Sequence, residues 1–145
     1  MTLESEIEVF LARNPYLIHR SFAAAQVKRQ VRRDRDRLDL LIEKKGKATI
    51  VEIKKTVLDA KAVQQLLRYL ERFGKDLNLG PTHYLVGLAP QEARLPRQTG
   101  IKLLFLGRNI PLRFLYDNHV RRYVKYDERL AANPIRFDSE IRFNL

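Results

Sequence analysis

The sequence predicts an α/β fold with a mixed central sheet flanked by helices. Patterns of apolar residues indicate the order helix, three strands, helix, strand, short helix and strand, an alternation that is typical of this class. The chain has 145 residues, enough for one domain with a buried core, and its 45% hydrophobic content argues against a disordered basic tail. We expect residues 1–109 to form the core and residues 110–145 a C-terminal extension packed on it.

The first element is a helix over residues 3–13. Asn14-Pro15 ends it, because a residue that precedes proline is pushed out of the helical region. Its apolar residues recur at helical spacing, at Leu3, Ile7, Phe10 and Leu11.

Three strands follow this helix. Residues 25–33 read as a basic strand, and the charged run 33–37 as a turn into the next strand. Residues 38–42 and 49–54 are apolar runs separated by a polar segment with Gly46, which predicts a hairpin.

The second half of the chain begins with a helix from an Asp59 cap to about Phe73, and Gly74 stops it. Its expected buried stripe is Val63, Leu66, Leu67, Leu70 and Phe73. Strands are expected at 83–88 and 102–106. Beyond residue 110 the pattern weakens: 111–116 extends the last strand, and 120–130 forms a helix or a further strand.

The composition favours a polyanionic partner. Lys and Arg number 28 against 17 acidic residues, a net charge of +11, so nucleic acid is favoured over the blander alternative of a ribosome-associated or merely basic protein. There is no cysteine, which excludes disulfides and thiolate metal sites. No apolar stretch reaches the ~20 residues of a membrane span, and the acidic start does not resemble a signal peptide. We therefore expect a cytoplasmic, intracellular protein without a membrane partner.

The most informative pattern is one Asp and a Glu-x-Lys, each inside an apolar strand. Glu52 and Lys54 share one face of their strand, because successive side chains of a strand alternate between faces. The predicted hairpin then brings Asp39 beside them. Asp39, Glu52 and the Ile53 carbonyl are candidate ligands of Mg²⁺ (or Mn²⁺), and Lys54 would orient or deprotonate water or neutralise phosphate charge. This layout suits phosphodiester cleavage. The alternative is an ordinary cross-strand salt-bridge cluster.

Two helices offer supporting groups. Glu6 is a candidate third acid from the first helix, with Glu4 and Glu8 close enough in register to compete with it. Gln65 and Tyr69 are spaced i, i+4 on the second helix, so they project from one face and can position water or a phosphate backbone. The alternative for the second helix is a solvated polar face.

Basic side chains near these motifs are candidates for nucleic-acid binding, because phosphate contacts dominate affinity. A solvated charged surface is the alternative. The candidates are Arg33, Arg35, Arg37, Lys55, Lys61, Arg68 and Arg72.

Together these motifs resemble the PD-(D/E)xK nuclease superfamily. Asp39 and Glu52-Ile53-Lys54 match its core, and Gln65 to Tyr69 resembles the QxxxY motif of its RecB-like branch. The likeness covers residues 3–90 and is closest to the nuclease domain of NucS/EndoMS-type endonucleases, whose first-helix acid carries best onto Glu6. The separate N-terminal domain of those enzymes is not part of this sequence, and residues 110–145 match nothing recognised, so mismatch specificity is not carried over.

The resemblance implies a restriction-endonuclease-like fold and a Mg²⁺- or Mn²⁺-dependent DNA endonuclease. Such an enzyme would be structure-selective and would act in DNA repair, recombination or mobile-element or phage metabolism. A homodimer is a further expectation. Three other functions stay open at this point. They are a Holliday-junction resolvase, a non-catalytic nucleic-acid-binding module, and a metal-free RNA endonuclease.

Overall fold

The computed structural model describes residues 3–90, 95, 98–110, 112–116 and 121–126, with side chains except those of Leu3, Glu6 and the last two strands. The helices and strands are α1 (Leu3–Arg13), β1 (Gln26–Arg33), β2 (Asp36–Lys44), β3 (Lys47–Val57), α2 (Ala60–Phe73), β4 (His83–Leu88), β5 (Ile101–Phe105), β6 (Leu112–Tyr116) and β7 (Arg121–Tyr126). Of the helices in these ranges, none has the length and apolar character needed to cross a membrane.

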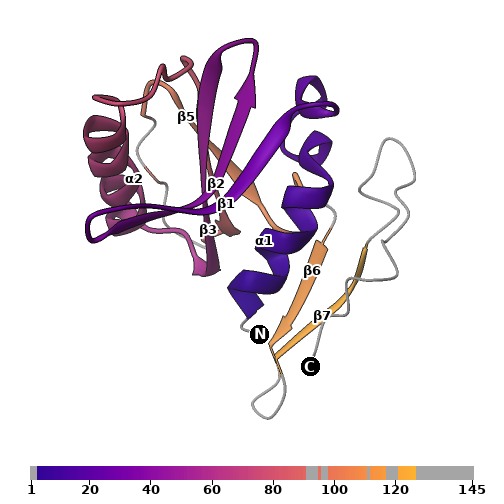
Figure 1. Ribbon diagram of the computed structural model, residues 1–145. Coiled ribbons are helices and arrows are strands. Elements are labelled where there is room, and N and C mark those ends of the chain that lie inside the picture. Colours follow the sequence, from indigo (N-terminus) through magenta and orange to yellow (C-terminus); the bar gives the residue numbers. More distant parts are fainter. Residues whose placement is uncertain (1–2, 91–94, 96–97, 111, 117–120, 127–145) are drawn as a thin grey trace.

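The predicted mixed sheet is confirmed. Its five strands lie in the order β1-β2-β3-β4-β5. The strands β1, β2 and β3 form an antiparallel meander, whereas β3, β4 and β5 run parallel. Helix α2 connects β3 to its parallel neighbour β4, as parallel pairing requires. Figure 1 shows α1 and α2 on opposite sides of this sheet.

Two apolar clusters fill the two sides of the sheet. The first packs α1 against one face through Ile7, Phe10 and Leu11. The second packs α2 against the other face through Val63, Leu66 and Phe73. Each helix thus buries its apolar stripe on its own face, and the sheet between them carries the strands that hold the polar motifs.

Helix α2 has the predicted ends, but one of them for a different reason. Asp59 Oδ1 accepts a hydrogen bond from the Ala62 amide at 2.9 Å, as an N-cap should. Gly74 has a right-handed conformation. A Cβ there would lie 2.6 Å from the Leu70 carbonyl oxygen, so the glycine is needed for space. Along the helix Tyr69 is buried, whereas Leu67 and Leu70, both expected in the buried stripe, are only half-buried.

Several expectations about the connections need correction. Two 3-10 turns, Pro15–Leu17 and Arg20–Phe22, follow α1 and were not predicted. β6 does not extend the last strand: it pairs with β7 in a separate two-stranded sheet. Of the two alternatives for residues 120–130, a helix or a further strand, residues 121–126 form the strand β7. The short helix expected between β4 and β5 falls mostly outside the described residues, and the packing of residues 110–145 on the core stays a prediction.

Candidate active site

The site lies where β3 separates from its neighbours. The pairing of β2 with β3 ends at Leu40 opposite Val51. On the other side, the register of β3 with β4 is irregular between Ile53 and Val57. Strand β3 therefore leaves its regular pairing with β2 beyond Val51 and with β4 beyond Ile53, and Glu52 and Lys54 lie in this stretch.

Two carboxylates replace the missing backbone pairing between β2 and β3. Glu52 accepts a hydrogen bond from the Asp39 amide at 3.1 Å. Asp39 in turn accepts one from the Ile53 amide at 2.8 Å. The side chains thus satisfy backbone donors that the opened ladder no longer pairs. The structure brings Asp39 and Glu52 together as the hairpin predicted, and each carboxylate uses one oxygen in this way.

The carboxylate pair has raised pKa values. Burial above all, together with the nearby charge of Asp39, raises the pKa of Glu52 from 4.5 to about 8. Burial likewise raises the pKa of Asp39 to about 6, opposed by the Ile53 amide and assisted by the charges of Glu8 and Glu4. Two neighbouring carboxylates with raised pKa values resist being ionised at the same time. A bound cation would stabilise their ionised forms.

The alternative of an ordinary salt-bridge cluster does not fit this geometry. In the described part of the chain Lys54 makes no ion pair with either carboxylate. Its charge lowers both pKa values, but less than burial raises them. The pair is therefore not neutralised by the lysine beside it.

A cavity of about 310 Å³, here called the carboxylate cavity, opens over this pair. Helices α1 and α2 and the β1–β2 hairpin all contribute to its wall. Its lining residues are Glu4, Arg32, Asp34, Arg35, Asp36, Arg37, Asp39, Glu52, Ile53, Lys54, Gln65 and Tyr69.

Among the described side chains of α1, the acid that lines the carboxylate cavity is Glu4. Its Oε1 accepts a hydrogen bond from the Lys55 amide at 3.1 Å, which ties the start of α1 to β3. Glu8, one turn further, is buried and bonded to Arg29 and Gln30 of β1. The side chain of Glu6 lies outside the described part, so its assignment to the site stays a prediction.

The predicted Gln–Tyr pair of α2 also reaches the carboxylate cavity. Gln65 Nε2 donates to Tyr69 Oη at 3.0 Å, and both residues line the cavity. Tyr69 is 7% exposed, so a solvated helix face does not describe this pair. The Arg68 guanidinium lies 5.6 Å from the centre of the Tyr69 ring, within cation–π range.

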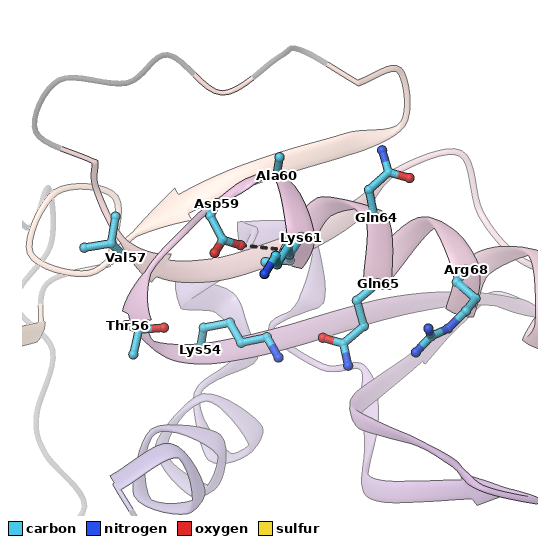
Figure 2. Close-up of a pocket in the computed structure, with 10 residues that line it drawn as sticks. Lys54, Thr56, Val57, Asp59, Ala60, Lys61, Gln64, Gln65 and Arg68 are labelled. Atoms are coloured by element: carbon cyan, nitrogen blue, oxygen red, sulfur yellow. Dashed lines mark hydrogen bonds between the residues drawn. The ribbon is translucent and has the colours of Figure 1, made fainter.

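A larger hollow of about 820 Å³, here called the helix cavity, adjoins the first along α2. The two share Lys54 and Gln65 as lining residues. Figure 2 shows the polar ends of Lys54, Gln65 and Arg68 in a row beneath α2. Lys61 lines the same cavity. The two cavities thus meet at Lys54 and Gln65 and together form a groove with basic side chains at both ends.

Ion pairs divide the predicted nucleic-acid-binding residues into two groups. Arg72 Nη1 lies 2.9 Å from Asp36 Oδ2, in an ion pair that lacks hydrogen-bond geometry. Arg72 Nη2 lies 3.3 Å from Asp34 Oδ2. Arg33 lies 3.6 Å from Asp76. These contacts hold the β1–β2 turn against α2 and its C-terminal end. Neither arginine lines the groove.

The remaining basic residues are distributed differently. Arg35, Arg37, Lys61 and Arg68 line the groove and pair with no acid in the described part of the chain, whereas Lys55 lines neither cavity. Arg32, a basic residue of the charged segment before the turn, also lines the carboxylate cavity. The register of the hairpin pairs it with Arg37.

The donor set suits a hard cation that keeps much of its water shell. Asp39 and Glu52 supply carboxylate oxygens, and Mg²⁺ is bound in proteins by one or two carboxylates together with waters and substrate phosphates. Among residues with described side chains, no cluster of three or more His, Cys, Asp or Glu residues has metal-binding geometry. Two carboxylates alone would suit a cation that completes its shell with waters and substrate oxygens.

Comparisons with known proteins agree with this fold. In the crystal structure of a repair endonuclease from Pyrococcus abyssi, a similar arrangement covers 63% of this chain and 40% of that chain, with a TM-score of 0.52 and 22% identity. This chain thus spans well under half of that protein. No curated protein sequence matches. The family model of the endonuclease NucS C-terminal domain matches residues 3–107, most of the chain. The chain belongs to the endonuclease NucS C-terminal domain family.

Proposed function

We propose that this chain is a metal-dependent DNA endonuclease of the PD-(D/E)xK type that acts in DNA repair. One observation carries the proposal: β2 and β3 open around a buried and a half-buried carboxylate whose pKa values are raised, and no lysine of the described residues forms an ion pair with either. The family name and the repair endonuclease of similar fold support the same class of reaction. The basic groove supports nucleic acid as the substrate.

Asp39, Glu52 and the Ile53 carbonyl would hold the Mg²⁺ or Mn²⁺ ion. When bound, the ion polarises the phosphodiester and makes a coordinated water a better nucleophile. The protein contributes by fixing the carboxylates: each is oriented by a backbone amide of the facing strand. This preorganisation lowers the reorganisation needed when charge develops at the phosphorus.

Lys54 and the Gln65–Tyr69 pair would act on the substrate between the two cavities. Lys54 lines both cavities, so its ammonium can orient water or neutralise phosphate charge at their junction. Gln65 is held by its hydrogen bond to Tyr69, which restricts its rotamers. Its amide is then placed to position a water or a phosphate oxygen.

Substituting Glu4 and Glu6 separately shows which of these glutamates of α1 acts at the site. We expect Glu4→Gln to lower the single-turnover cleavage rate by about tenfold or more, because Glu4 lines the carboxylate cavity and bonds the Lys55 amide. Glu6→Gln gives the matched measurement on the same helix. A larger loss in Glu6→Gln than in Glu4→Gln would return the assignment to Glu6.

The division of the arginines predicts different effects on DNA binding. Arg68→Ala should reduce the slope of log K against log salt concentration by about 0.7–0.9, the contribution of one phosphate contact. Arg72→Ala, one turn further on α2, should change the slope much less because Arg72 is paired with Asp34 and Asp36. Equal changes in both variants would contradict this division. Fluorescence anisotropy over a salt series measures it.

The proposed activity is tested by incubating the protein with Mg²⁺ or Mn²⁺ and end-labelled DNAs. The panel contains single strand, duplex, mismatched duplex, flap and four-way junction, with an EDTA lane. Metal-dependent cleavage supports the proposal, and the preferred substrate separates junction resolution from other specificities. Salt-sensitive binding without cleavage of any DNA would favour a non-catalytic binding module, and EDTA-resistant cleavage of RNA a metal-free ribonuclease.

A further inference from the structure

One residue inside β1 has a backbone conformation that strands do not normally contain. Gln30 has a φ of +54°, in the left-handed region. The other non-glycine residues of the described chain with positive φ are Asp34 and Lys45, and both lie in turns. Gln30 instead has paired residues on both sides of it.

This residue lies directly opposite Asp39. Arg29 pairs with Leu40 and Val31 pairs with Leu38, so the register places Gln30 across from the carboxylate-bearing residue. The register is the same before and after this point, and no residue is inserted. The unusual conformation is therefore not a bulge of one extra residue. It is a point at which the side chains of the strand change from one face of the sheet to the other, here called the reversal.

In both strands of the β1–β2 hairpin, side chains that a regular strand would place on one face lie toward α1 on one side of this level and toward α2 on the other. Leu40 is buried in the α1 cluster, but Leu38, two residues away, is buried in the α2 cluster. On β1, Val27 packs on the α1 cluster and Val31 on the α2 cluster. Residues two apart in a regular strand point to the same face. Both strands thus turn over between these pairs, with Asp39 at the turning point.

A buried carboxylate of α1 holds the reversed residue. Glu8 has a side chain that is 3% exposed. It accepts hydrogen bonds from Gln30 Nε2 at 2.5 Å and from Arg29 Nε at 3.0 Å. Because Ile7 and Leu11 anchor α1 in the core, Glu8 is a fixed point to which the reversal is attached. Strained backbone of this kind persists only where surrounding contacts impose it, and it concentrates at functional sites.

We propose that Gln30 and Glu8 are positioning residues that orient the Asp39 carboxylate in the active site. The reversal at Gln30 turns β2 over at Asp39 and so directs this carboxylate toward Glu52 and the Ile53 amide. Its effect on cleavage rests on the proposed nuclease function. The orientation itself is independent of that function.

The test compares three variants. Gln30→Val removes the bond to Glu8 and places a β-branched side chain where positive φ is strongly disfavoured. Gln30→Gly removes the same bond but accepts positive φ. Lys45→Val is the matched control, because Lys45 has a φ of +50° in the β2–β3 turn at the other end of β2. Thermal melts ensure that all are compared in the folded state.

The direct readout is the amide of Ile53 in ¹H–¹⁵N NMR spectra, since this amide donates to Asp39 Oδ2. We expect Gln30→Val to move its proton shift toward that of Asp39→Ala, which has no acceptor for this amide, and to speed its hydrogen exchange. Gln30→Gly should stay near the wild-type shift, and Lys45→Val should leave it unchanged. An unchanged Ile53 amide in Gln30→Val, or an equal shift in Lys45→Val, would overturn the proposal.

The second readout is the single-turnover cleavage rate at saturating metal and DNA. Misplacement of a reacting group by about 1 Å costs up to about a hundredfold, so Gln30→Val should fall by about ten- to a hundredfold and Lys45→Val should match wild type. Gln30→Gly should recover most of the rate. If wild type itself cleaves nothing, the proposed function fails, but the Ile53 amide still decides whether Gln30 orients Asp39.

Discussion

Asp39→Asn and Glu52→Gln should each lower metal-dependent DNA cleavage by about a thousandfold or more, while DNA binding persists. The two amides have nearly the same shape as the carboxylates and keep an oxygen that can accept the Ile53 or Asp39 amide proton. What they lack is the negative charge that a divalent cation requires. The loss should therefore be chemical rather than structural.

Single-turnover cleavage and binding of the same labelled DNA measure this separation. Glu71→Gln, on the exposed surface of α2, is the control for a change of charge outside the groove and should cleave like wild type. Isothermal titration with Mn²⁺ adds a readout without substrate, in which wild type binds the ion and both site variants bind it much more weakly. Full activity in either site variant would remove Asp39 and Glu52 from the mechanism.

Glu52→Gln should be more stable than wild type by on the order of a few kcal/mol at pH 9, and this advantage should vanish near pH 4. The folded-state pKa of Glu52 is raised from the ordinary value of 4.5 to about 8, and that of Asp39 from 3.8 to about 6. Between these values the unfolded chain has released protons that the folded chain retains. Wild type therefore loses stability as pH rises through this window, and the neutral glutamine removes most of that loss.

Urea denaturation of both proteins from pH 4 to pH 9 gives the free energy of unfolding directly. The difference between variant and wild type is the informative quantity, because other titrating groups cancel in it. Mg²⁺ at pH 8 should restore stability to wild type but not to the variant, since a ligand of the folded state adds RT ln(1 + [L]/Kd). A difference that does not vary with pH would show that the pair ionises normally.

The sequence predicted elements whose signals are local. Helix α1 was predicted with its observed bounds because its stripe at helical spacing ends at Asn14-Pro15. The β2–β3 hairpin followed from two apolar runs and a turn glycine, and Gly46 has the expected positive φ of 76°. The nearness of Asp39 and Glu52 then follows from strand pairing alone.

Features that depend on distant partners were not predictable in this way. Three glutamates alternate along α1, and only the placement of the helix against β3 puts Glu4 in the cavity. Ion pairing of Arg72 requires the β1–β2 turn to reach α2. β6 gave the pattern of a strand, but its pairing partner is not a local property. The reversal at Gln30 has no sequence signal, since glutamine is not a residue that positive φ favours.

The hydrogen bonds from backbone amides to Asp39 and Glu52 also limit how such a site can be lost in evolution. An alanine at either position would leave a donor of the partly buried strand pair without its acceptor, which costs stability as well as activity. An asparagine or glutamine would cost activity alone. A descendant of this chain that had turned from cutting DNA to only holding it is therefore expected to carry amides at positions 39 and 52, a pattern by which such inactive relatives could be recognised in sequence collections.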